Sequence, residues 1–305
     1  MLTEKINIIK ASGETVAFSS EKLKQSLTKS GAAENAIAEI LKAVQDKLYD
    51  GITTKEIYKM AFSLLKKNAG HFAARYKLKR AIMELGPSGF PFERFVAAIL
   101  KKQGYQTQVG VIVEGHCVKH EIDVIAEKDN KHFMVECKFH NSSGFYCNVK
   151  IPLYIQSRFL DVEKQWQKMP GHATKFHQGW VVTNTRFTTD AIQFGECAGL
   201  HLLGWNYPTE ASLKAMIDKS GLHPFTCLTT LTKKEKQKLL DKNIVLCMDL
   251  CKDEMPLLDI GIKINQVKKI ITVELAGITD QERVRKYLQS SANLQFFEVY
   301  NIGEI

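Results

Sequence analysis

The chain has 305 residues, and its 42 Lys and Arg against 33 Asp and Glu give a net charge of +9. Hydrophobic residues make up 45% and charged residues 25% of the sequence, which is ordinary for a globular protein and excludes a disordered chain, a collagen-like repeat or a disulfide-rich mini-protein. The length predicts two or three domains, and the charge invites a polyanionic partner without deciding which chemistry takes place.

The first 86 residues are predicted to form a β-hairpin followed by helices. β-branched runs at residues 6–9 and 15–18 flank a short turn, which is typical of a hairpin. Apolar residues then recur at helical spacing, and Thr53 with Glu56 matches a capping box that opens the third helix. The expected helices cover residues 20–30, 37–48, 54–65 and 71–85.

Two prolines and two glycines at residues 86–91 mark the clearest domain boundary, because they cannot continue a helix. After them, helices and strands alternate, which predicts an α/β domain with a mixed sheet. Its helices are expected at 91–102, 153–167 and 188–198, and its strands at 107–114, 117–126, 132–139, 179–183 and 200–205. From Pro208 onward the chain is predicted to be mostly helical, with segments at 212–219, 233–241, 245–251 and 264–275.

The central region carries charged residues on strands that are otherwise apolar. Glu121 and Asp123 share one face of the first strand, because side chains alternate along a strand. Glu136 and Lys138 share one face of the next strand for the same reason. A short turn joins the two strands, so we expect them to pair antiparallel and to bring three carboxylates and a lysine together.

Such a cluster has two interpretations. Burying charged groups without partners costs several kcal/mol each, so the strands need a compensating ion or network. Carboxylate oxygens suit Mg²⁺ or Mn²⁺, and a neighbouring lysine can help to activate water, which favours metal-assisted phosphodiester hydrolysis. The alternative is a structural ladder of cross-strand ion pairs on a half-exposed sheet face.

Asp123 followed by Glu136-x-Lys138 resembles the PD-(D/E)xK motif of nucleases, and its setting resembles the Mrr-like, type IV branch of restriction endonucleases. The resemblance covers residues 88–207, with Ile122 in place of the usual proline before Asp123. It implies a restriction-endonuclease-like α/β core, DNA as substrate, and a divalent metal held by Asp123 and Glu136. Lys138 would help to activate water or stabilise the phosphate in the transition state.

The same resemblance assigns supporting roles to residues around this motif. Either Glu93, on the helix that opens the domain, or Glu121 would assist the metal-binding carboxylates. Gln156 lies on the helix after the core strands, where many Mrr-like members carry a glutamine. Tyr154 and Arg158 flank Gln156 and could contact a DNA phosphate; the alternative for both is an ordinary helix surface.

A second resemblance lies in the N-terminal region, over residues 5–86. The hairpin, the entry to the first helix and the last helix are similar to the ATP-cone of ribonucleotide reductases and their repressor, in segments 8–13, 18–23 and 74–82. This resemblance implies that ATP or dATP is a regulatory ligand. The residues implied to bind it are Lys10 and Lys22 for the phosphates, with Ser19 and Thr53 for the rest of the nucleotide.

Without that resemblance, the lysines of the N-terminal region would be interpreted as solvated charges. Lysines on a hairpin and at a helix start can also hold a phosphate. Ala11 stands where the ATP-cone pattern usually has an arginine. A glycine-rich Walker-type loop is absent from the sequence, so ATP hydrolysis by a P-loop is not expected.

The C-terminal region is less specific. Segments 229–234 and 258–263 weakly resemble helix-hairpin-helix modules, which offer backbone amides and lysines to DNA phosphates. The alternative is a small helical bundle or a dimer interface. The Cys and His pairs of the chain have no second pair at zinc-site spacing, so we expect no structural zinc.

We therefore expect an α/β multi-domain protein: an ATP-cone at 1–86, a restriction-endonuclease-like domain at 88–207 and a helical domain at 208–305. Its expected activity is Mg²⁺-dependent cleavage of DNA, regulated by ATP or dATP through the state of a homo-oligomer, which would suit defence against foreign DNA. The alternative is a non-catalytic, nucleotide-responsive DNA-binding regulator. Scattered cysteines and short apolar runs favour a cytoplasmic protein without a membrane partner.

Overall fold

The computed structural model describes residues 6–68, 70–142, 144–168 and 176–270. The chain divides into two compact units, one formed by Ile82–Leu222 and the other by the two flanking parts of the chain. Within the described residues, none of the helices is both long and apolar enough to span a membrane.

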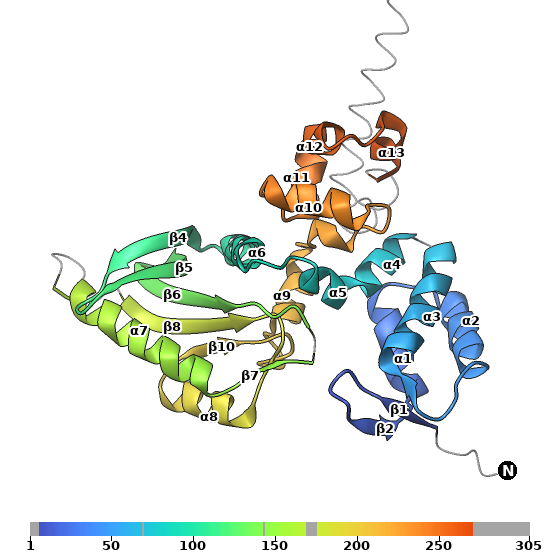
Figure 1. Ribbon diagram of the computed structural model, residues 1–305, viewed down its shortest axis with the longest axis horizontal. Coiled ribbons are helices and arrows are strands. Elements are labelled where there is room, and N and C mark those ends of the chain that lie inside the picture. Colours follow the sequence, from blue (N-terminus) through green and yellow to red (C-terminus); the bar gives the residue numbers. More distant parts are fainter. Residues whose placement is uncertain (1–5, 69, 143, 169–175, 271–305) are drawn as a thin grey trace, which may run out of the picture. The chain divides into compact units, whose positions relative to one another are not determined.

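The N-terminal part of the first unit packs helices on a small sheet with strand order β2-β1-β3 (Figure 1). Its strands are β1 (Asn7–Ile9), β2 (Thr15–Ala17) and β3 (Ile52–Thr53), with β1 antiparallel to β2 and parallel to β3. Its helices are α1 (Ser20–Lys29), α2 (Glu34–Gln45), α3 (Thr54–Asn68), α4 (Gly70–Tyr76) and the first part of α5 (Leu78–Met83), which continues into the second unit from Ile82. Apolar side chains from the sheet and helices, including Leu27, Ile40 and Leu65, form its core.

The single helix expected at 71–85 is two helices, α4 and α5, separated at Lys77. Lys77 is 9% exposed, and its Nζ donates to the carbonyl of Thr226, 2.9 Å away in the C-terminal part of the same unit. The hydroxyl of Thr226 in turn donates to the carbonyl of Ala81 over 2.6 Å. This break therefore coincides with a long-range contact that helical periodicity does not encode.

The C-terminal part of the first unit is helical, as predicted (Figure 1). It comprises η1 (Phe225–Cys227), α10 (Lys233–Asp241), α11 (Cys247–Lys252), α12 (Met255–Asp259) and α13 (Ile264–Lys269). The helix predicted at 264–275 begins as expected, and its residues 271–275 lie outside the described residues.

The second unit is built on a mixed sheet, as predicted, and within the described residues its strand order is β10-β8-β6-β5-β4. The strands β4 (Gln106–Glu114), β5 (Lys119–Lys128) and β6 (Lys131–Lys138) are antiparallel neighbours. β8 (Phe176–Thr183) and β10 (His201–Leu203) then add in parallel to β6. The strands β7 (Tyr146–Cys147) and β9 (Arg186–Phe187) form a separate parallel pair.

Helices cover this sheet through apolar side chains. They are α6 (Phe90–Lys102), α7 (Lys150–Trp166) and α8 (Thr189–Cys197), and a further helix, α9 (Leu213–Ser220), packs against α6. Phe159 and Val162 of α7 pack against Met134 of β6. A Cβ at Gly195 of α8 would lie 2.6 Å from Leu202, so a glycine is required for the close approach of α8 to β10.

The predicted antiparallel pairing of the two charged strands is confirmed. Val124 of β5 pairs with Val135 of β6, and the register continues to Lys128 and Lys131 at the turn. Asp129 and Asn130 make the turn with positive φ angles of 52° and 59°, as a two-residue hairpin loop requires.

Candidate active site

Asp123 lies where β5 and β6 stop pairing. The strand register ends at Val124 and Val135, and one carboxylate oxygen of Asp123, Oδ2, accepts the backbone N–H of Cys137 over 2.7 Å. This bond replaces a strand–strand hydrogen bond, because a buried backbone donor needs an acceptor. The divergence of the strands thus places the Asp123 side chain beside the segment that carries Glu136.

Glu136 is 6% exposed and binds Arg158, which reaches it from α7. The Arg158 Nη1 donates to Glu136 Oε2, and its Nη2 donates to the backbone carbonyl of Glu121. The other carboxylate oxygen of Glu136, Oε1, is buried and has no hydrogen-bond partner within the described residues. Glu136 therefore keeps one oxygen available for a further positive group.

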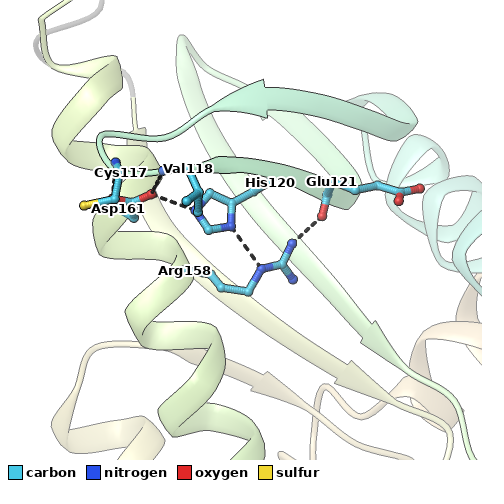
Figure 2. Close-up of polar contacts among 6 residues, drawn as sticks. All are labelled: Cys117, Val118, His120, Glu121, Arg158 and Asp161. Atoms are coloured by element: carbon cyan, nitrogen blue, oxygen red, sulfur yellow. Dashed lines mark hydrogen bonds and ion pairs between the residues drawn. The ribbon is translucent and has the colours of Figure 1, made fainter.

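A chain of hydrogen bonds holds Arg158 in this position (Figure 2). Its Nε donates to Nδ1 of His120 over 3.4 Å, and Nε2 of His120 lies 2.8 Å from Oδ2 of Asp161. Asp161 also accepts the backbone N–H groups of Cys117, at 2.8 Å, and Val118, at 3.3 Å. Asp161 thus attaches α7 to the turn between β4 and β5, and Arg158 attaches the same helix face to β5 and β6.

Burial and mutual repulsion perturb the carboxyl groups of the site. Burial, with the charges of Asp123 and Glu121, raises the pKa of Glu93 to about 7. Burial and Asp123 raise the pKa of Glu136 to about 8, although Arg158 acts in the opposite direction. Burial also raises the pKa of Asp123, against the Cys137 N–H and Arg158. The cluster is short of positive charge even with Arg158 in place.

The donor chemistry of the cluster fits a hard divalent cation. Asp123 and Glu136 supply carboxylate oxygens, and Oε1 of Glu136 is buried without a partner among the described residues. The amide oxygen Oε1 of the predicted residue Gln156, on α7, is also buried without a partner among them. In the described part of the chain, no three His, Cys, Asp or Glu side chains are arranged to hold a metal ion. One or two carboxylates completed by water and phosphate suit Mg²⁺, whereas zinc prefers more protein ligands.

Most of the other predicted residues lie at this cluster. Lys138 lies at the exposed end of β6, two residues after Glu136, and its charge acts to lower the pKa of Asp123 against the larger effect of burial. The Glu121 carboxylate points away from Arg158 (Figure 2) and contributes to the raised pKa of Glu93. The Tyr154 side chain is exposed, and the Arg158 guanidinium lies 5.6 Å from the centre of its ring.

Sequence reasoning missed His120 and Asp161. Arg158 is also more than the ordinary helix surface that was its alternative, since its side chain is 13% exposed and bonded to Glu136. One signal was available, because Arg158 and Asp161 are three residues apart and therefore share a helix face. Their partners lie on β5, on β6 and in the turn before β5, and the sequence alone does not show that these segments meet α7.

The four residues predicted to bind nucleotide form two groups. Thr53 pairs with Ile9 across β1 and β3, next to Lys10, whose Nζ makes a 2.9 Å ion pair with Glu14. Ser19 and Lys22 lie at the start of α1, beyond the opposite end of the hairpin, and the Ser19 hydroxyl accepts the Lys22 N–H. The Thr53 hydroxyl belongs to a capping box with Glu56, as predicted.

Comparison with known proteins assigns families to these regions. The chain matches the ATP cone domain over residues 6–84, a restriction endonuclease domain over 86–153, and the AF1548-like C-terminal domain over 223–274. An uncharacterized protein of Archaeoglobus fulgidus is 36% identical over 177 residues, which are 58% of this chain and 95% of that protein. The chain belongs to the AF1548-like family.

The crystal structure of AF1548, a protein of unknown function, supports this relationship. It is 32% identical to this AF1548-like chain with a TM-score of 0.50, and the match covers 68% of this chain and 100% of that one. The predicted fusion of an ATP-cone with a restriction endonuclease domain is confirmed. The endonuclease match includes Asp123, Glu136 and Lys138 and ends before Arg158.

Proposed function

We propose that this AF1548-like protein is a metal-dependent endonuclease that hydrolyses DNA phosphodiester bonds. The observation that carries the proposal is the meeting of Asp123 and Glu136, with Lys138 beside them, where β5 and β6 diverge. Asp123 and Glu136 would hold Mg²⁺ or Mn²⁺. When bound, this cation would polarise the phosphate and lower the pKa of a water molecule.

The remaining side chains would position the substrate and move protons. Lys138 would orient the attacking water or neutralise charge that develops on the phosphate. Glu93 and Glu121 would assist the metal-binding carboxylates, and Gln156 would accept a hydrogen bond from a water or ligand. Tyr154, exposed next to Arg158, would lie against the DNA backbone.

The ATP-cone match supports regulation by nucleotide. ATP or dATP would bind through Lys10, Ser19, Lys22 and Thr53 and would change the oligomeric state, and with it the rate of cleavage. The direction of that change is an outcome of the cleavage assay, run with and without each nucleotide.

The proposal is tested by nicking of supercoiled plasmid DNA in Mg²⁺. Asp123→Ala removes a proposed metal ligand and Lys138→Ala removes a positive charge beside the phosphate, so each is expected to lower the rate by at least about a hundredfold, the lower end for the loss of one charge-stabilising group. The exposed residues Lys101 and Glu210 provide controls, since alanine there should leave cleavage unchanged. Equal cleavage by wild type and Asp123→Ala would contradict the assignment.

One observation favours a second function, that of a non-catalytic DNA-binding regulator. Arg158 is already bonded to one oxygen of Glu136, an oxygen that a catalytic cation could otherwise use. A protein that binds DNA tightly but does not nick it in Mg²⁺ or Mn²⁺, with or without ATP and dATP, would establish this alternative. A structural ladder of ion pairs would give neither cleavage nor binding.

A further inference from the structure

Arg158 and a divalent cation require the same carboxylate. The guanidinium binds Glu136 Oε2 and the Glu121 carbonyl, and the Glu136 carboxylate is also one of the two proposed metal ligands. A cation that uses both oxygens of Glu136 has to displace Arg158. A cation that uses only Oε1 lies next to the positive guanidinium, which repels it.

The position of Arg158 is fixed by the residues that surround it. Because Nδ1 of His120 accepts the Arg158 Nε–H, the ring proton lies on Nε2 and is donated to Asp161. Two backbone N–H groups orient Asp161 in turn (Figure 2). All three side chains are nearly buried, with exposed fractions of 10% for His120, 13% for Arg158 and 14% for Asp161.

We propose that Arg158 is a built-in competitor of the divalent cation at Glu136, and that His120 and Asp161 are positioning residues that keep it there. The inference rests on the proposed metal site. It adds that metal binding by this protein is coupled to release of an arginine. The released guanidinium remains beside the exposed Tyr154, where a DNA phosphate can accept its hydrogen bonds.

This arrangement makes the metal affinity depend on side chains that never touch the metal. Removing the charge of Arg158 removes a competitor, so the cation should bind more tightly although the protein has lost a nearly buried ion pair. A coupling between two sites is typically worth about 5- to 150-fold in affinity. Loss of His120 or Asp161 loosens Arg158 without removing its charge. The affinity for the cation should therefore rise in these variants too, but by less than in a variant that lacks Arg158.

The test is a titration of the full chain with Mn²⁺ alone, in which electron paramagnetic resonance measures the free ion. Arg158→Gln is expected to bind Mn²⁺ at least about fivefold more tightly than the wild type, the lower end of that range. Arg158→Lys, which keeps a positive charge, should stay close to wild type. Arg186→Gln is the matched control, because Arg186 is an exposed arginine of the same unit that donates to the Tyr146 hydroxyl.

The Mn²⁺ affinity of variants at the positioning residues provides a second measurement, which remains informative if Arg158→Gln does not fold. His120→Asn and Asp161→Asn should each bind Mn²⁺ more tightly than wild type and less tightly than Arg158→Gln. A merely structural role would weaken Mn²⁺ binding in these variants, because a loosened hairpin would disorder the carboxylates.

The outcomes separate the inference from the proposed function. If wild type binds Mn²⁺, Asp123→Ala loses it and Arg158→Gln binds no more tightly, the competitor role is wrong while the metal site stands. If neither wild type nor any variant binds Mn²⁺, the inference fails together with the proposed metal site.

Discussion

Asp161 shows how one carboxylate can fix the shape of a site from outside it. It accepts hydrogen bonds from His120 and from the backbone of Cys117 and Val118, and these bonds hold the β4–β5 turn against α7. The His120 bond, followed by those of Cys117 and Val118, keeps the pKa of Asp161 below its ordinary value. The charged form is therefore favoured in the folded protein.

The sign of the resulting pH dependence follows from linkage. A carboxyl group whose folded pKa is lowered stabilises the protein above its unfolded pKa, about 4 for Asp, and this contribution is lost as the pH falls through the folded pKa. Asp161→Asn should therefore lower the melting temperature at neutral pH, and the difference from wild type should shrink below about pH 4. Scanning calorimetry of wild type and Asp161→Asn from neutral pH to below about pH 4 measures the two melting temperatures and the difference between them. Asp218→Asn, in an exposed pair with Lys214, is the control, and a pH-independent difference would contradict the argument.

At this scale the sequence predicted the residues whose chemistry is unusual for their position. Asp123, Glu136 and Lys138 stand out because each is a charged residue on an otherwise apolar strand, and a short turn joins the two strands. His120 and Asp161 do not stand out, because a histidine on a strand and an acid on a helix are both common. The two residues that form this hydrogen bond are 41 positions apart in the sequence, so the bond depends on how α7 packs against the hairpin.

At the scale of elements, α3 begins at a reciprocal hydrogen-bond pair. The Thr53 hydroxyl accepts the Glu56 N–H over 3.2 Å, and the Glu56 carboxylate accepts the Thr53 N–H over 3.0 Å. The same carboxylate accepts the Thr53 hydroxyl proton, and these contacts lower the pKa of Glu56. Thr53 is therefore a structural residue even before any nucleotide contact is considered.

Thr53→Ala should destabilise the start of α3 by about 0.5–2 kcal/mol, the usual cost of losing an N-cap side chain. Amide hydrogen exchange of the first turns of α3 should become faster in the full chain. Thr53→Ser keeps the hydroxyl and should exchange like wild type. Thr54→Ala, one residue later, is the matched control, and equal acceleration by Thr54→Ala would show that the capping box is not the cause.

Helices and strands with a clear period were predictable, and short or bent ones were not. The alternating pattern gave the β5–β6 hairpin, and the capping box gave the start of α3, because both are local. The two-residue strands β7 and β9 were missed, since a segment of that length has no period to detect. The break between α4 and α5 was missed because it coincides with a contact to Thr226.

At the scale of the whole molecule, the unit that contains the restriction endonuclease match is inserted in the sequence between the two parts of the other unit. The chain leaves the first unit after Ala81 and returns to it at His223. Near these two points the Thr226 hydroxyl binds the Ala81 carbonyl, and Lys77 binds the Thr226 carbonyl. These contacts join the two parts of the first unit at the positions where the chain leaves it and returns to it, so a nucleotide that altered the packing of α4 would alter contacts near both connections.

This route requires that nucleotide binds to the ATP-cone, and Lys10 offers the sharpest test. Its ammonium group is paired with Glu14 across the hairpin turn, at 2.9 Å. A phosphate that recruits Lys10 has to compete with the Glu14 carboxylate. Lys10→Ala should therefore weaken binding of ATP or dATP, whereas Glu14→Gln should preserve or strengthen it, because the lysine remains and its competitor is gone.

Calorimetric titration of the full chain with ATP and with dATP measures both variants. A charge-assisted hydrogen bond is worth about 1.5–3 kcal/mol, so Lys10→Ala should raise the dissociation constant by roughly 10- to 150-fold. Lys29→Ala, at the far end of α1, is the control for the loss of one positive charge. If Lys10→Ala and Glu14→Gln weaken binding equally, the ion pair itself shapes the hairpin and Lys10 does not contact phosphate.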